Sequence, residues 1–269
     1  MKTAVIISAH TKARELGFVL AGYAVQTTPP NEIIVTQDGT DPRIAPVIEH
    51  ARTYGLTITH LTQPHQGFGK CRALNRAIQH ACSDLLIFTD GDCIPRNDFV
   101  QRFTELIRRG QFLAGGSHIN LPEHFYQTHD LTESIRNQSL FLYSTLTQIT
   151  GFHKSRFRLT RCTTLARALD QLTQRNAFSG ANSAAFRTDI LAVGGFDESM
   201  GYGGEDTNLG IRLNNIGIRG IRARYSLVTL HLDHQRSYAD PSIILANKIW
   251  NKTIKKKRNI FPKTSCLLI

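Results

Sequence analysis

Two carboxylates one residue apart, Asp90 and Asp92, follow the short apolar run 85–88. The run is too short for a helix and is typical of a strand buried on both faces. Because Gly91 relaxes the steric limits between them, the two side chains can converge on one point and hold a divalent cation. A surface turn that caps the next helix is the alternative for any single Asp-x-Asp. The position also suits a cation, since open α/β sheets bind ligands at the carboxyl ends of their strands, and the motifs later in the chain favour this interpretation.

Two further groups of polar residues lie later in the chain. Glu205 and Asp206 follow paired glycines and open an expected helix over 207–215. Acidic residues favour a first helical turn on electrostatic grounds alone, but they also suit a general base held on a rigid element. His231 and His234 follow an expected strand over 227–230, and two imidazoles three residues apart can reach one metal or have structural roles.

The elements that would position these groups alternate regularly over residues 1–117. Strands are expected at 4–9, 32–36 and 56–61, helices at 15–26, 42–54 and 70–81, and a further strand ends at Asp90. This alternation is typical of a parallel, doubly wound sheet with right-handed crossovers. The sequence therefore predicts an α/β, Rossmann-like fold whose strands end in ligand-binding residues.

Polar residues follow each expected strand. Asp38 suits a nucleoside because its carboxylate can accept a hydrogen bond from a ribose hydroxyl or a base N–H, although an Asp-Gly turn explains it equally well. Lys12 and Arg14 follow the first strand, and Lys70 and Arg72 begin a helix. Cations beside helix N-termini fit a pyrophosphate. Solvated surface charge is the alternative for each of them.

The pattern changes after residue 117. Residues 118–177 predict a largely helical insertion, with a helix over 131–143, that binds an acceptor or serves as scaffold. Residues 178–240 return to the first domain with small residues at which a backbone can approach a ligand closely. We expect acceptor contacts there from Ala181, Asn182, Gly203 and Gly204. Residues 241–269 form a basic, amphipathic tail that suits an anionic membrane surface or is simply solvated.

The composition limits the classes of partner. The 269-residue chain has 32 Lys and Arg against 21 Asp and Glu, a net charge of +11 that favours polyanionic partners. No recognised nucleic-acid-binding motif accompanies this charge, so we expect no nucleic-acid partner. Five cysteines without metal or redox spacing predict reduced thiols in a cytoplasmic protein. The basic tail adds a peripheral contact with the inner face of a membrane.

The ordered set of motifs resembles that of family 2 glycosyltransferases of the GT-A fold. The matching stretches are Gln37-Asp-Gly-Thr40, Gly67-Phe-Gly-Lys-Cys-Arg-Ala-Leu-Asn75, Asp90-Gly-Asp92, Gly180-Ala-Asn182, Gly194-Gly-Phe-Asp197, Gly203-Gly-Glu-Asp206 and His234. The Gly-Gly-Glu-Asp stretch is also similar to the C-terminal segment of β-1,4-galactosyltransferase-like enzymes. The resemblance covers residues 4–117 and 178–238. Thr11-Lys12 and Gln37 depart from the family pattern, which often has Asn-Arg and a second Asp at these positions.

The resemblance implies a nucleotide-sugar donor, most often UDP-linked, with Mn²⁺ or Mg²⁺ and inversion at the anomeric carbon. A divalent cation would stabilise the diphosphate leaving group, and we predict Asp92 as its first ligand, His234 as the next and His231 as a third candidate. Carboxylate and imidazole together suit Mn²⁺ better than Ca²⁺. Asp90 would contact the ribose or a metal-bound water. Ser8 and Gly91 complete the predicted donor site.

The predicted reaction moves a hexose of the Gal, Glc, GalNAc or GlcNAc class from a UDP-sugar to a hydroxyl of a glycan or lipid-linked acceptor, such as a cell-envelope glycan. Asp206 would act as general base and Glu205 would orient the acceptor. The alternative is a sugar nucleotidyltransferase, which also joins a Rossmann-like half to metal-binding carboxylates. Such enzymes usually carry a glycine-rich loop after the first strand, and residues 8–12 contain no glycine.

Overall fold

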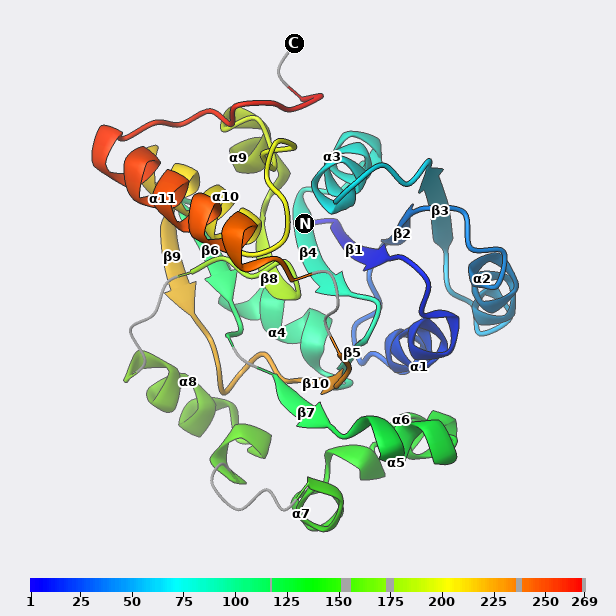
Figure 1. Cartoon of the computed structure of the whole chain (residues 1–269). Helices are drawn as coiled ribbons and strands as arrows, with labels where there is room; N and C mark the ends of the chain where they lie inside the picture. The colour runs from blue at the N-terminus through cyan, green and yellow to red at the C-terminus, as the bar shows by residue number, and fades with distance from the viewer. Residues whose placement is uncertain (117, 151–155, 173–176, 236–238, 268–269) are drawn as a thin grey trace.

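A central sheet organises the computed structural model, which describes residues 1–116, 118–150, 156–172, 177–235 and 239–267 (Figure 1). Seven strands lie in the order β3-β2-β1-β4-β8-β6-β9. The first four run parallel to one another, and β8 runs antiparallel to both β4 and β6. The mostly parallel α/β sheet predicted from the sequence is confirmed. The strands are β1 (Thr3–Ala9), β2 (Glu32–Asp38), β3 (Ile58–Gln63), β4 (Leu85–Asp90), β6 (Gln111–Ala114), β8 (Asn182–Phe186) and β9 (Arg219–Arg222).

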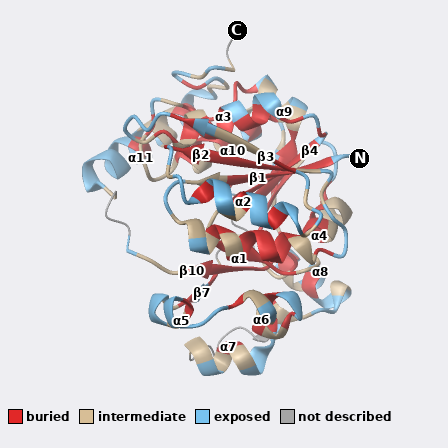
Figure 2. Ribbon diagram, turned by 90° about the vertical axis from the view of Figure 1, so that its right-hand side faces the viewer, coloured by how far each residue is buried: buried red, intermediate tan, exposed pale blue. Residues whose placement is uncertain are grey.

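Helices cover both faces of the sheet. Successive residues of a strand point to opposite faces, so each buried strand contributes side chains to the core on both sides. Val5 and Ile7 of β1 pack in a buried cluster with α1 (Ala13–Ala24), α2 (Ile44–Arg52) and α4 (Phe99–Leu106). Ala4 and Ile6 of the same strand pack in a second cluster with α3 (Lys70–His80), α9 (Arg187–Ala192) and α10 (Glu205–Asn215). Figure 2 shows β1 and β2 buried between these layers. The carboxyl edge of the sheet is thereby left for polar loops.

A second, smaller sheet joins distant parts of the chain beside this edge. Its strands are β5 (Cys93–Pro95), β10 (Thr229–Leu232) and β7 (Ile119–Leu121), in that order. The antiparallel register of β10 with β5 sets His231 opposite Cys93. A residue more than a hundred positions downstream is thus brought next to the Asp90–Asp92 turn.

The insertion is helical but more broken than the sequence predicts. It contains α5 (Glu123–Thr128), α6 (Thr132–Arg136), α7 (Tyr143–Thr150), α8 (Thr163–Gln171) and the short 3-10 helices η1 (Ser139–Phe141) and η2 (Arg156–Leu159). The single helix expected over 131–143 is wrong. Gln138 adopts a left-handed conformation with φ of 63°, and this residue separates α6 from η1.

The C-terminal segment packs on the main domain. Helix α11 (Pro241–Lys257) lies along α10, and Asn247 Nδ2 donates to the main-chain oxygen of Gly201, in the loop before α10, at 2.9 Å. Beyond it, the main-chain N–H of Lys263 donates to Asp197 Oδ2 at 3.1 Å, and that of Cys266 donates to Glu198 Oε1 at 2.9 Å. Among the described residues, no helix is both long and apolar enough to cross a membrane.

Candidate active site

The first part of the site is a carboxylate between two imidazoles. His234 Nε2 lies 3.1 Å from Asp92 Oδ2, and His231 Nε2 lies 3.8 Å from Asp92 Oδ1. Each of the three residues offers one ligand atom, and these atoms lie within 4.8 Å of one another. Lys12 Nζ, 3.0 Å from Asp92 Oδ2, supplies an opposite charge. The structure therefore brings together all three predicted metal ligands.

The charges in this cluster are strongly coupled. Burial alone would raise the pKa of Asp92, but the hydrogen bond from His234 and the charges of Lys12 and His231 hold that pKa well below its usual range. The same hydrogen bond raises the pKa of His234. Asp92 is therefore ionised at neutral pH and can bind a cation.

Asp90 belongs to a second, adjoining network. The parallel register of β1 and β4 sets Ser8 opposite Asp90, and Ser8 Oγ donates to Asp90 Oδ1 at 2.5 Å. Lys70 Nζ, at the start of α3, lies 2.6 Å from the same oxygen. A Cβ on Gly91 would lie 3.1 Å from the main-chain oxygen of Ser8, so this glycine serves a close approach between the two strand ends.

The third part is the acidic pair at the start of α10. Asp206 Oδ2 accepts a hydrogen bond from the Gly180 main-chain N–H at 3.0 Å, and Glu205 Oε2 accepts one from Gly203 at 2.8 Å. Burial raises the pKa of Asp206 above its ordinary value. Burial and the charge of Asp206 raise the pKa of Glu205 to about 7. Glu205 therefore changes its protonation state near neutral pH.

Lys70 lies close to the carboxylates of Asp90, Glu205 and Asp206. Burial alone would lower its pKa, but the charges of Asp90, Glu205 and Asp206 raise it above the ordinary value. A Cβ on Gly180 would lie 3.9 Å from both Asp206 Cβ and Lys70 Nζ. The ammonium group therefore lies between the Asp90 turn and the acidic pair, which places the two halves of the predicted site in one region.

Three predicted donor contacts have other partners. Arg14 donates to the main-chain oxygens of Gln127 and His129, at 2.7 and 3.1 Å, and so faces the insertion. Arg72 donates to the main-chain oxygen of Pro64 at 2.9 Å. Asp38 lies at the end of β2, where its carboxylate accepts hydrogen bonds from Gly69 N–H and the side chains of Gln63 and His65. None of these three contacts Asp90 or Asp92 among the described interactions.

The residues predicted to contact the acceptor also differ in their surroundings. Asn182 is fully buried in β8 and donates to the main-chain oxygen of Leu227 at 3.1 Å, so its side chain is not available to an acceptor. Gly203 and Gly204 have φ of 101° and 99° and lie against α11, where a Cβ on Gly203 would lie 2.7 Å from Ile244 Cγ1. Their glycine identity follows from backbone conformation and packing. Ala181, next to Gly180, is half-buried beside the acidic pair.

His118 is a further residue of the site that was not predicted from the sequence. Its Nδ1 lies 2.5 Å from Thr229 Oγ1, and its ring centroid is 5.9 Å from that of His231. Burial and the neighbouring His231 lower its pKa to about 4, so the imidazole is neutral at pH 7. His118 directly precedes β7, and only the pairing of β7 with β10 brings it to the site. A pairing between such short, distant strands leaves no local signal in the sequence.

The mostly parallel α/β sheet is that of a GT-A glycosyltransferase. The sequence matches the model of glycosyl transferase family 2 over residues 4–172, and the chain belongs to this family. A second model, described as the N-terminal domain of galactosyltransferase, matches residues 163–235. The second match contains Glu205, Asp206, His231 and His234, and the first contains Asp90 and Asp92.

Sequence relatives include a chondroitin synthase from Escherichia coli, 25% identical over 222 residues, which are 79% of this chain and 32% of that protein. Another is a 4,4'-diaponeurosporenoate glycosyltransferase from Staphylococcus aureus, 31% identical over 90 residues, or 33% of this chain and 23% of that protein. The chain thus spans a third or less of the length of these relatives.

Solved structures share the fold at low sequence identity. Staphylococcus aureus TarS 1-349 in complex with UDP-GlcNAc has a TM-score of 0.63 and 12% identity, with 96% of this chain and 69% of that chain covered. The mannosyltransferase PcManGT from Pyrobaculum calidifontis, in complex with GDP-Man and Mn²⁺, has a TM-score of 0.60 and 18% identity. That match covers 88% of this chain and 58% of the other.

Proposed function

We propose that the protein is a divalent-cation-dependent, inverting glycosyltransferase that moves a hexose from a UDP-sugar to an acceptor hydroxyl. The observation that carries the proposal is the position of Lys70, whose Nζ lies 2.6 Å from Asp90 and whose pKa responds to the charges of Glu205 and Asp206. The Asp90–Asp92 turn, which would bind the nucleotide, therefore lies in the same region as the buried acidic pair. The UDP-GlcNAc and GDP-Man in the two related structures support a nucleotide-sugar donor.

Asp92, His231 and His234 would hold the cation, Mn²⁺ or Mg²⁺. Of the two ions the donor set fits Mn²⁺ better, because two imidazoles accompany the single carboxylate within 4.8 Å and Mg²⁺ prefers oxygen ligands alone. When bound, the cation would neutralise charge that develops on the departing diphosphate. Lys12, which now contacts Asp92 at 3.0 Å, would add a further positive charge toward the diphosphate. Asp90 and Ser8 would then contact the ribose side of the donor.

Asp206 would take the proton from the acceptor hydroxyl. The main-chain N–H groups of Gly180 and Thr207 hold its two carboxylate oxygens, at 3.0 and 2.7 Å. Burial raises its pKa, which makes it a stronger base than an exposed aspartate, and Lys70 keeps the ionised form accessible. Glu205 would orient the acceptor for attack from the face opposite the diphosphate, through an oxocarbenium-like state.

The acceptor is proposed to be a glycan or lipid-linked molecule presented at an anionic membrane. On α11, Leu245 and Ile249 are 57% and 58% exposed. At about 100° per residue they share the face opposite the buried Asn247 and Ile254, and Figure 2 shows the outer part of α11 exposed. Lysines 248, 252 and 256 lie on the same outer face. Apolar side chains flanked by cations suit the interface of an anionic bilayer.

A donor screen tests the proposal directly. The protein is incubated with UDP-hexoses and an extract of glycan acceptors, with Mn²⁺ or with EDTA, and free UDP and glycosylated product are measured. We expect both products with Mn²⁺, none with EDTA, and recovery when Mn²⁺ is restored. Consumption of a nucleoside triphosphate with pyrophosphate release would instead identify a sugar nucleotidyltransferase. Transfer that is indifferent to EDTA would refute the cation-binding role of Asp92.

A further inference from the structure

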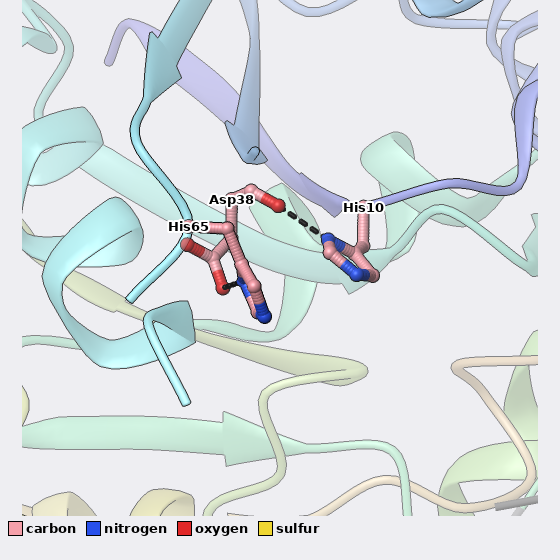
Figure 3. Close-up of side chains that lie close together, drawn as sticks. All are labelled: His10, Asp38 and His65. Carbon is pink, nitrogen blue, oxygen red and sulfur yellow. Dashed lines mark hydrogen bonds and ion pairs between the residues drawn. The ribbon is translucent and has the colours of Figure 1, made fainter. Parts of the chain in front are cut away.

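A second group of metal-ligating side chains lies at the carboxyl edge of the sheet. His10 follows β1, Asp38 ends β2 and His65 follows β3 (Figure 3). Each offers one ligand atom, and these atoms lie within 4.8 Å of one another. The three residues lie at the carboxyl ends of three strands that the parallel order β3-β2-β1 places side by side. None of them is part of the Asp92, His231 and His234 cluster.

We propose that His10, Asp38 and His65 form a second metal site, which takes a zinc-class dication. Two imidazoles and one carboxylate suit Zn²⁺ and similar first-row ions, whereas Mg²⁺ and Ca²⁺ prefer oxygen ligands alone. His65 Nδ1 lies 3.0 Å from Asp38 Oδ2. Ligand atoms on a tetrahedral zinc with bonds of about 2.0 Å lie about 3.3 Å apart, so this pair is nearly at ligand spacing.

The surroundings hold the carboxylate in place. Asp38 Oδ1 accepts a hydrogen bond from Gln63 Nε2 at 2.9 Å, and Oδ2 accepts one from the Gly69 main-chain N–H at 3.1 Å. His10 Nδ1 contacts the main-chain oxygen of Asp38, which keeps this ring beside the carboxylate. Partners of this kind orient the ligands of protein metal sites.

Access differs between the three ligands. Asp38 is 8% exposed, whereas the His65 side chain is 52% exposed and His10 is exposed as well. A cation can therefore enter from solvent and keep an open coordination position. The centroids of the two imidazole rings are 4.7 Å apart, so both rings lie beside the same carboxylate.

The bound cation would have two consequences. It would link the carboxyl ends of three strands and so stabilise the folded state by an amount that rises with the logarithm of its concentration above the dissociation constant. It would also occupy Asp38, which the sequence predicts as a contact for the nucleoside of the donor, so the metal and the nucleoside would exclude each other. This second consequence rests on the proposed function, whereas the metal site itself does not.

Zinc binding to the purified protein, measured by equilibrium dialysis, tests the site without any assay of transfer. The His234→Ala variant removes a ligand of the first cluster, and His10→Ala or His65→Ala is then added in that background. The matched control adds His124→Ala, which removes an exposed histidine of α5. Both His10 and His65 are exposed, so their replacement leaves the buried core intact.

We expect the His234→Ala protein and its His124→Ala control to bind one zinc ion equally well. His10→Ala and His65→Ala should each weaken that binding by on the order of 100-fold or more, since loss of an outer partner alone costs about 10- to 100-fold. Equal zinc binding in all four proteins, or none in the His234→Ala background, would overturn the site. Uridine, which carries no phosphate to chelate zinc, should weaken binding. Zinc affinity unchanged by saturating uridine would refute only the competition.

Discussion

Replacement of Glu205 by glutamine should change how stability depends on pH. Glu205 is 6% exposed, and burial together with the charge of Asp206 raises its pKa from 4.5 to about 7. A carboxyl group whose pKa is higher in the folded state binds more protons when folded. Its contribution to stability is therefore complete below pH 4.5 and is lost as the pH rises through about 7. The difference between the two pKa values corresponds to about 3 kcal/mol.

The Glu205→Gln variant lacks this titration and keeps an acceptor oxygen for the Gly203 N–H. Urea unfolding of both proteins between pH 5 and pH 8 measures the effect. The variant should gain stability relative to the wild type by most of that ~3 kcal/mol across this range. Glu133→Gln, at an exposed position of α6, is the matched control and should show no such trend. A stability difference between Glu205→Gln and wild type that stays constant with pH would refute the argument.

Two further predictions concern the packing and the exposed face of α11. Gly203→Ala should destabilise the fold by about 2–4 kcal/mol, because φ of 101° is strained for alanine and its Cβ would lie 2.7 Å from Ile244 Cγ1. The control is Gly55→Ala, with φ of 83° and open space around the Cβ, which should cost only about 1–2 kcal/mol. Denaturant unfolding measures both variants. An equal loss of stability in the two would contradict the close packing of α11 against Gly203. Replacement of both Leu245 and Ile249 by serine should weaken sedimentation with anionic vesicles by roughly 10- to 100-fold. Leu172→Ser, which removes an apolar side chain 79% exposed in the insertion, should leave vesicle binding unchanged; an equal loss in both proteins would argue against a membrane-binding face on α11.

The parallel half of the fold was predictable because its signals are local. Each buried strand is a short apolar run that ends in polar residues, and the strand expected at 4–9 corresponds to Thr3–Ala9. The Asp90–Asp92 turn follows such a run directly. The strand expected over 227–230 is instead Thr229–Leu232, because its limits are set by pairing with β5 and β7. Those partners lie far away in the sequence.

The directions in which side chains point were harder to predict from the sequence. Lys12 and Arg14 are two residues apart around the start of α1, so they point to different sides. Lys12 reaches Asp92, whereas Arg14 reaches the main-chain oxygens of α5 and its C-cap. Without the position of the insertion, both cations fitted a pyrophosphate equally well.

The role of the small residues was also ambiguous from the sequence. The stretch around Asn182 is a buried strand, and Gly203 and Gly204 make room for α11. A pattern of small residues predicts close approach but does not say whether the approaching group is a ligand or the protein itself. His10 and His65 were overlooked for a different reason, because their loops meet only once β1, β2 and β3 are placed side by side.

The central claim is that Asp206 acts as the base in a site shared with the Asp90–Asp92 turn. Its most direct test is a comparison of turnover and donor affinity in Asp206→Asn, with a UDP-sugar that the donor screen identifies. We expect turnover to fall by about 10²- to 10⁴-fold while the dissociation constant of the donor stays within about threefold of the wild type. Near-normal turnover in Asp206→Asn would contradict the account.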